Sequence, residues 1–251
     1  MISLGVSVTD RDGVRHVVLD RADKKNALTV AMYATLADAI VSASKDDVGA
    51  VLISARGSAF TAGNDLRDFL DQPPHGEDAP VFHFLEGLMR TDVPIVAAVR
   101  GAAVGIGTTM LLHCDVVYAA PNANFRVPFV DLGLVPEAAS SVLLPRRIGR
   151  ARTGAAIFLG EPIDAQTALT AGLISAIVAD EELDAKAETA ARAIAAKPRE
   201  AVRETKRLMN HDREANLEAM RREGVAFRER LASDEARAAM ASFFHRATRP
   251  A

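Results

Sequence analysis

The stretch Gly101-Ala-Ala-Val-Gly-Ile-Gly-Thr-Thr-Met-Leu-Leu-His-Cys-Asp115 decides which fold we expect for this chain. It follows the apolar run Pro94–Val99, which is typical of a buried strand. Its three glycines allow a tight turn and a close backbone approach. The residues after Gly107 are typical of a first helical turn. The pattern therefore predicts a strand, a glycine turn and a helix start, whose free N–H groups suit a phosphate or a developing oxyanion.

A similar pattern lies upstream. Here the predicted strand Val51–Ser54 is followed by Phe60-Thr-Ala-Gly-Asn-Asp65. Two strand-to-glycine elements of this kind can place two backbone N–H donors at one site. We therefore expect the two glycine stretches to lie together.

Length and composition narrow the class of protein. With 251 residues and 49% apolar residues, the chain is long enough for one large α/β domain, or for one domain with an appendage. A net charge of −3 without long single-sign runs argues against nucleic-acid binding. The single cysteine, Cys114, permits no intrachain disulfide. Early charges at 10–12 argue against a signal segment, and no apolar run is long enough for a membrane helix. We expect a cytoplasmic protein with no membrane partner.

Hydrophobic periodicity predicts the order of the elements. We expect strands at 4–9, 14–20, 49–54, 94–99, 115–119 and 173–178, and helices at 30–44, 81–89, 138–144, 150–158, 165–171 and 198–209. A strand–helix–strand order favours an α/β fold with parallel pairing. The segment 72–80 is rich in helix breakers and is predicted to be a linker.

The chain is almost entirely helical from residue 182 onward in this prediction. We therefore divide it into an α/β core with the active site (1–180) and a C-terminal helical region (181–251). An apolar stripe runs along the second part through Leu217, Met220, Gly224, Phe227 and Leu231. Such a stripe must dock either on the chain's own core or on a neighbouring subunit.

Three common chemistries fit the sequence poorly. No Gly-x-Ser-x-Gly sequence is present for a serine hydrolase, and no His or Cys spacing is typical of a metal site. Gly105-Ile-Gly-Thr-Thr-Met110 begins like a dinucleotide fingerprint but lacks the third glycine. We therefore expect no metal and no nicotinamide cofactor.

The chain resembles the crotonase superfamily, the enoyl-CoA hydratases and isomerases, over nearly its whole length. The segments that carry the resemblance are Arg21–Leu28, Gly57–Leu66, Pro94–Gly107, Cys114–Asp115 and Leu132–Pro136. The resemblance implies an α/β fold with a ββα spiral core and a C-terminal helical region for trimer assembly. It also implies an acyl-CoA thioester ligand, a homotrimer or dimer of trimers, and no cofactor apart from the CoA of the substrate.

The resemblance also assigns residues to a binding site. The oxyanion hole of the family maps onto the backbone N–H groups of Ala62 and Ile106. The implied contacts with substrate and CoA are Arg21, Lys24, Ala27, Gly63, Asn64, Asp65, Leu66, Gly105, Phe129 and Phe243, with Lys25 as a further candidate for the phosphates. Phe243 is expected to reach the site of a neighbouring subunit.

The acid–base residue decides the reaction within the family. Hydratases use two glutamates, and here the matching positions are Thr109 and Phe129. In Δ3,Δ2-enoyl-CoA isomerases one glutamate is the base, and Glu137 stands in a similar Pro-Glu-small-Ser-Ser context. The apolar neighbours of Glu137 are expected to raise its pKa. Asp131 is the rival carboxylate.

These features favour an enoyl-CoA isomerase that shifts a 3-enoyl-CoA to a 2-trans-enoyl-CoA, in fatty acid or related acyl-CoA metabolism. Two alternatives stay open at this point: an enoyl-CoA hydratase, and a catalytically weak acyl-CoA-binding protein with the same fold.

Overall fold

The computed structural model describes residues 5–74, 76 and 78–247, without the side chains of 243–247. The strands are β1 (Val6–Arg11), β2 (Val14–Leu19), β3 (Ala50–Ala55), β4 (Ile95–Val99), β5 (Ala102–Val104), β6 (Val116–Ala119), β7 (Asn124–Arg126), β8 (Ile163–Asp164) and β9 (Ala176–Ile177). The helices are α1 (Val30–Ala43), α2 (Leu66–Asp71), α3 (Pro80–Arg90), α4 (Ile106–Thr109), α5 (Ser140–Ile148), α6 (Arg150–Phe158), α7 (Ala165–Thr170), α8 (Asp180–Ala195), α9 (Arg199–Met209), α10 (Arg213–Leu231) and α11 (Asp234–Ala247). Short 3-10 helices lie at η1 (Ala22–Lys24), η2 (Met110–His113) and η3 (Val130–Leu132).

The main sheet has six strands in the order β1-β2-β3-β4-β6-β9. Only β1 and β2 pair antiparallel in it, and the other pairs are parallel. A smaller sheet, β5-β7-β8, joins one parallel and one antiparallel pair. The predicted α/β class with parallel pairing is therefore confirmed.

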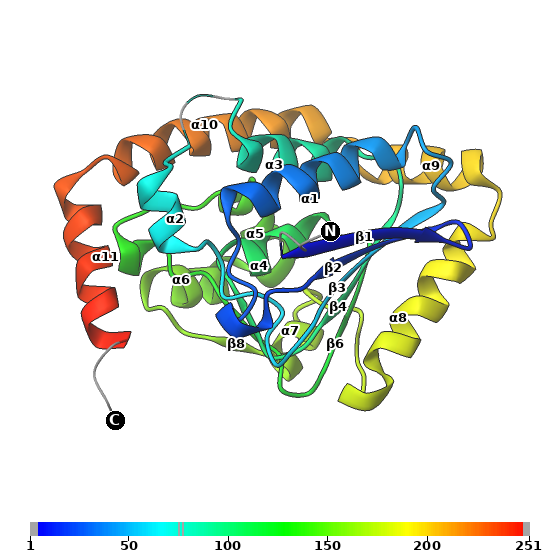
Figure 1. Cartoon of the computed structure of the whole chain (residues 1–251), viewed down its shortest axis with the longest axis horizontal. Helices are drawn as coiled ribbons and strands as arrows, with labels where there is room; N and C mark the ends of the chain where they lie inside the picture. Colours follow the sequence, from blue (N-terminus) through cyan, green and yellow to red (C-terminus); the bar gives the residue numbers. More distant parts are fainter. Residues whose placement is uncertain (1–4, 75, 77, 248–251) are drawn as a thin grey trace.

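The central strand β4 is buried on both faces, as its uninterrupted apolar sequence predicts. Ile95, Ala97 and Val99 face the larger core, to which α1 and α3 also contribute. Val96 and Ala98 face a second core shared with α8. Figure 1 shows α8 on the opposite side of the sheet from α1 and α3. The first helix of the predicted C-terminal region thus covers the main sheet, and the division at residue 180 stays a prediction.

Several boundaries differ from the prediction for local reasons. The helix predicted from residue 138 begins at Ser140, because Ala138 and Ala139 are left-handed. The strand predicted at 173–178 is reduced to Ala176–Ile177. The predicted glycine turn contains the short strand Ala102–Val104, which pairs with β7.

Helix α10 docks on the chain's own core, which was one of the two partners predicted for its apolar stripe. Leu217, Met220, Phe227 and Leu231 are buried there. The ring of Phe227 meets Phe69 edge to face, with 6.1 Å between the ring centroids. Figure 1 shows α10 running along the side of the molecule that carries α1 and α3. Within the described residues, none of the helices has the length and apolar composition needed to cross a bilayer.

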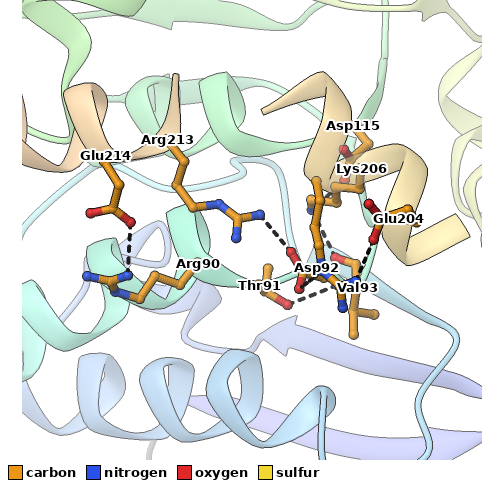
Figure 2. A network of polar contacts seen from close by, with 10 residues as sticks. Arg90, Thr91, Asp92, Val93, Asp115, Glu204, Lys206, Arg213 and Glu214 are labelled. Atoms are coloured by element: carbon orange, nitrogen blue, oxygen red, sulfur yellow. Dashed lines mark hydrogen bonds and ion pairs between the residues drawn. The ribbon is translucent and has the colours of Figure 1, made fainter. Parts of the chain in front are cut away.

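Ion pairs fasten the C-terminal helices to the sheet (Figure 2). The buried ammonium group of Lys206, on α9, donates to Asp115 Oδ2 at 2.7 Å and to the Val93 carbonyl at 2.9 Å. Asp115 Oδ2 also accepts the Ile95 N–H at 2.7 Å. Because a buried charge is costly unless it is paired, this contact fixes α9 to the start of β4 and to the segment before β6.

A second group of ion pairs in Figure 2 joins α9 and α10 to the loop before β4. The carboxylate of Asp92 accepts a hydrogen bond from the guanidinium group of Arg207, on α9, at 2.7 Å, and another from that of Arg213, on α10, at 2.6 Å. Both helices are therefore held at the same loop, and α10 leaves this point toward α3 and α5.

The two glycine stretches lie together, as predicted. A Cβ atom on Gly101 would stand 2.0 Å from the Ser58 carbonyl oxygen, and one on Gly107 would stand 2.5 Å from Thr61 Cγ2. The segments 58–61 and 101–107 thus approach closely enough to exclude side chains at these two positions.

We predict that Gly101→Ala destabilises the fold by about 3 kcal/mol or more. The added methyl group overpacks the contact, and residue 101 has a φ of 59°. Gly154→Ala is the matched control, because a Cβ atom on this helical glycine would meet only Phe158 Cδ2, at an ordinary contact distance of 3.9 Å. Alanine there is expected to stabilise by about 0.5–1 kcal/mol. Urea unfolding measures both changes, and equal effects of the two variants would contradict the proposed contact.

Candidate active site

Glu137 lies just before α5, at the point where the chain turns inward. Its main-chain carbonyl accepts the Ser140 N–H at 2.9 Å. The next two residues, Ala138 and Ala139, have φ angles of 60° and 57°. The side chain of Glu137 is only 6% exposed as a result. The structure thus places the predicted base inside the protein.

Glu137 lines a narrow apolar pocket between α2, α3 and α10. The other residues that line this pocket are Phe69, Pro74, Val81, Phe82, Leu85, Ala138, Met220, Gly224 and Phe227. Among the described lining residues, Glu137 is the only one with an ionisable side chain. The cavity measures only about 10 Å³, so it holds no more than one water-sized group unless its apolar walls move apart.

Burial raises the pKa of Glu137 to about 8. The negative charge of Glu223 acts in the same direction, and the Thr109 hydroxyl opposes the rise. A carboxyl group with a pKa near neutral can both take up and release a proton under physiological conditions. The predicted direction of this pKa shift is confirmed.

Three buried polar atoms next to this pocket have no hydrogen-bond partner in the described part of the chain. They are Glu137 Oε1, Thr109 Oγ1 and Ser140 Oγ. Buried polar groups are nearly always paired in folded proteins, and exceptions call for an explanation. Their concentration around one carboxyl group is consistent with a ligand or water that completes the site.

Two backbone N–H groups can form the predicted oxyanion hole. Thr61 and Ala103 form an isolated parallel bridge. Asn64 and Ile106 each follow the bridge by three residues, so both lie beyond the same end of the parallel bridge. Ile106 is the first residue of α4, so its N–H has no acceptor within the helix. No described residue accepts a hydrogen bond from either N–H group.

The prediction of Ala62 as an oxyanion-hole donor is wrong. Its N–H donates to the Lys25 carbonyl at 2.9 Å. This carbonyl reaches Ala62 from a loop in which Lys25 and Asn26 are both left-handed. The next N–H, of Gly63, faces Thr61 Oγ1 at 3.1 Å. Asn64, which the sequence indicated only as a CoA contact, therefore supplies the first free donor.

Tyr33 is a residue of the site that the sequence analysis missed. Its buried hydroxyl donates to the side-chain oxygen of Asn64. Burial raises its pKa well above the usual value, and the charge of Glu137 raises it further. In sequence, Tyr33 looks like one more core residue of an amphipathic helix, so only the contact with Asn64 reveals its position.

Asn26 is a second residue that the sequence analysis missed. It is fully buried, and its side chain accepts the Arg21 N–H and donates to the carbonyls of Arg56 and Ala59, all at 2.8–2.9 Å. Its own carbonyl accepts the Thr61 hydroxyl at 2.6 Å. Asn26 thus holds the loop 21–28 against the loop 56–64.

The predicted CoA contacts lie along these two loops. The guanidinium group of Arg21 is engaged with Asp65 Oδ2 at 2.7 Å and with the Ala27 carbonyl at 2.9 Å. Lys24 and Lys25 are exposed on the same loop. Since Arg21 is already paired, the two lysines are the better candidates for phosphate groups.

The remaining predicted contacts fall in three places. Gly63 and Gly105 directly precede the residues with the free N–H groups. Asp65 caps α2, and Leu66 is its first residue. Phe129 is buried in the loop between β7 and η3. Asp131 is exposed, and its carboxylate lies against Gly160, so the structure favours Glu137 over it. Phe243 belongs to α11, and its side chain lies outside the described residues.

The sequence and the fold of this chain are both similar to those of known proteins. The model of the enoyl-CoA hydratase/isomerase family matches residues 9–249. Enoyl-CoA delta isomerase 2 of Rattus norvegicus is 31% identical over 251 residues, which cover 97% of this chain and 64% of that protein, so the chain spans less than two thirds of its length. The 1,2-epoxyphenylacetyl-CoA isomerase of Escherichia coli (strain K12) is 34% identical over 194 residues, 74% of each chain. An enoyl-CoA hydratase/isomerase from Pseudoalteromonas atlantica T6c has a crystal structure that matches with a TM-score of 0.93 and 41% identity, over 96% of this chain and 97% of that one.

We predict that Glu137→Gln stabilises the protein increasingly as the pH rises from about 4.5 to about 8. A carboxyl group whose pKa is raised by folding costs no stability below its unfolded pKa, and it costs progressively more until the pH passes its folded pKa. The difference in Tm between variant and wild type should therefore grow over this interval and then stay constant. Thermal unfolding across the pH range measures it.

Asp131→Asn is the control for this experiment, because it removes an exposed carboxylate. Its Tm should follow that of the wild type at every pH. A constant Tm difference for Glu137→Gln from pH 4.5 to 8 would contradict the raised pKa of Glu137.

Proposed function

Because the chain belongs to the enoyl-CoA hydratase/isomerase family, we propose that it isomerises a 3-enoyl-CoA to a 2-trans-enoyl-CoA with Glu137 as the base. Its predicted crotonase-like fold is confirmed by the likeness to the Pseudoalteromonas structure. The observation that carries the proposal is that Glu137 is the one ionisable residue among the described residues that line the apolar pocket, with the Thr109 hydroxyl rather than a second pocket acid beside it.

The proposed reaction moves one proton within one molecule. The Glu137 carboxylate takes a proton from C2 of the acyl chain, and the electron pair of the C–H bond delocalises onto the thioester oxygen. The resulting dienolate then takes the same proton from Glu137 at C4, and the double bond ends between C2 and C3. One carboxyl group suffices because no water is added, and no cofactor is required apart from the CoA of the substrate.

The N–H groups of Asn64 and Ile106 would stabilise the dienolate oxygen. Charge develops on this oxygen only during the reaction, so donors held in advance favour the transition state over the substrate. Loss of one such donor costs about 3–4 kcal/mol in related sites. The hydrogen bond from Tyr33 fixes the Asn64 side chain and so supports this arrangement.

The remaining parts of the substrate match the surfaces around Glu137. The apolar walls from α2, α3 and α10 would take the acyl chain. The exposed Lys24 and Lys25 would meet the phosphates of CoA at the edge of the site.

We predict that Glu137→Gln lowers isomerase turnover by about 10²–10⁴-fold, the usual contribution of a general acid–base group. Asp131→Asn should retain wild-type turnover. The assay follows the appearance of the conjugated 2-enoyl thioester from a 3-enoyl-CoA. A Glu137→Gln variant with full turnover would exclude Glu137 as the base.

A parallel hydration assay separates the two alternatives. It follows the loss of conjugation when a 2-enoyl-CoA is supplied. Hydration as fast as isomerisation would identify a hydratase. Tight binding of acyl-CoA with neither reaction would identify a binding protein.

We also propose that the protein is a homotrimer, or a dimer of trimers, assembled in part through an apolar surface at the end of α6. Phe158 and Leu159 are 69% and 70% exposed there, and Val130 of the neighbouring η3 is 45% exposed. Contiguous exposed apolar side chains of this size are typical of interaction surfaces.

We predict that Leu159→Glu lowers the mass measured by light scattering toward that of a monomer. Val41→Glu is the matched control, because Val41 is 49% exposed on α1, away from α6. It should leave the mass unchanged. A Leu159→Glu variant with the mass of the wild type would contradict the proposed interface.

A further inference from the structure

The turn after Glu137 adopts an unfavourable backbone conformation. Ala138 and Ala139 both have positive φ angles, although neither is a glycine. Such residues persist only where the surroundings impose the conformation, and they are common at functional sites. The turn therefore needs partners that hold it.

Glu223 of α10 is the first partner. Its Oε2 atom accepts the Ala139 N–H at 2.6 Å, and its Oε1 atom accepts the Ser141 N–H at 2.9 Å. The side chain is buried, with 8% exposure. These are N–H groups at the start of α5, where Ala139 provides no side-chain cap. Glu223 thus caps α5 from a distant part of the sequence.

His113 of η2 is the second partner. Its Nε2 atom lies 2.9 Å from the Ala138 carbonyl. Burial lowers the pKa of His113 to about 4, so the ring is neutral at physiological pH. Since a carbonyl only accepts, Nε2 carries the proton and donates. The turn is therefore held at its carbonyl by His113 and at its N–H groups by Glu223.

We propose that Glu223 and His113 are positioning residues for Glu137: together they hold the 138–141 turn, His113 at the Ala138 carbonyl and Glu223 at the N–H groups of Ala139 and Ser141, and Glu223 brings its negative charge to this turn. The proposal rests on the proposed role of Glu137 as the base. It adds a function for two residues that do not touch the pocket.

The charges around Glu137 support this division of roles. Among the described residues, Glu223 is the charged group that shifts the pKa of Glu137. The charge of Glu137 in turn raises the pKa of the Tyr33 hydroxyl on α1, which therefore stays protonated. Burial raises the pKa of Glu223 itself, whereas the hydrogen bonds from Ser141 and Ala139, and the charge of Arg222, lower it. Burial lowers the pKa of His113, and the charges of Lys206 and Arg147 act in the same direction.

The two carboxyl groups therefore differ in their partners. Glu223 has N–H donors that stabilise its negative charge, whereas Glu137 Oε1 has no partner among the described residues. Two nearby acids in such unequal settings titrate apart, and the one without donors keeps its proton longer.

The test is the pH dependence of kcat/KM in Glu223→Gln. The amide oxygen still accepts a hydrogen bond, but the charge is gone. We expect the acidic limb of the profile to move to lower pH by about one unit or more, because a like charge no longer opposes ionisation of Glu137. We also expect kcat to fall, since one of the two N–H groups loses its acceptor.

Glu229→Gln is the matched control, because it removes an exposed carboxylate from the same helix. Its profile should coincide with that of the wild type. His113→Phe should lower kcat without moving the acidic limb, and His113→Gln should restore part of kcat because its amide can donate. A Glu223→Gln profile that coincides with the wild type would overturn the proposal.

Titration of Glu137 by carbon-13 NMR separates this proposal from the proposed reaction. Its signal is assigned by its loss in Glu137→Gln, and its midpoint needs no substrate. A lower midpoint in Glu223→Gln supports the positioning role even if the enzyme proves not to be an isomerase, and an unchanged midpoint refutes it. If Glu223→Gln does not fold, Glu223→Gln/Ala139→Gly provides the same measurement, because glycine adopts the turn without strain.

Discussion

The close approach of two loops is the constraint on which this structure depends. The segments 58–61 and 101–107 meet with no space for side chains at Gly101 and Gly107. The bridge between Thr61 and Ala103 fixes their register, and the N–H groups of Asn64 and Ile106 lie beyond the same end of this bridge. The free donors of the site are thus a direct product of backbone packing.

The sequence predicted the parts of the site that depend on local patterns. The strand predicted at 94–99 appears at Ile95–Val99, and the helix predicted after Gly107 begins slightly earlier, at Ile106. Glu137 stands out in the sequence because its context is short and contiguous, and its role as the base stays a proposal. Ala62 was a wrong prediction because its N–H is taken by the Lys25 carbonyl, whose direction depends on two left-handed residues in another loop.

Residues that act over long sequence distances escaped the sequence analysis for the same reason. Glu223 looks like one charged residue among many on α10, and His113 looks like the end of an apolar helix. Their roles follow from contacts across the fold: a carboxylate at the start of α5, and an imidazole at the Ala138 carbonyl. Placing α10 there depends in turn on Asp92, which binds Arg207 and Arg213.

Helix α10 contributes both to the pocket wall and to the surroundings of Glu137. Met220, Gly224 and Phe227 line the pocket, and Glu223 lies between the first two in sequence. A methyl group on Gly224 would already stand 3.1 Å from the ring of Phe82. Any sliding or rotation of α10 that widens this pocket would therefore also pull Glu223 from the 138–141 turn. The width of the pocket and the hold on the turn are mechanically linked, because both depend on the position of one helix.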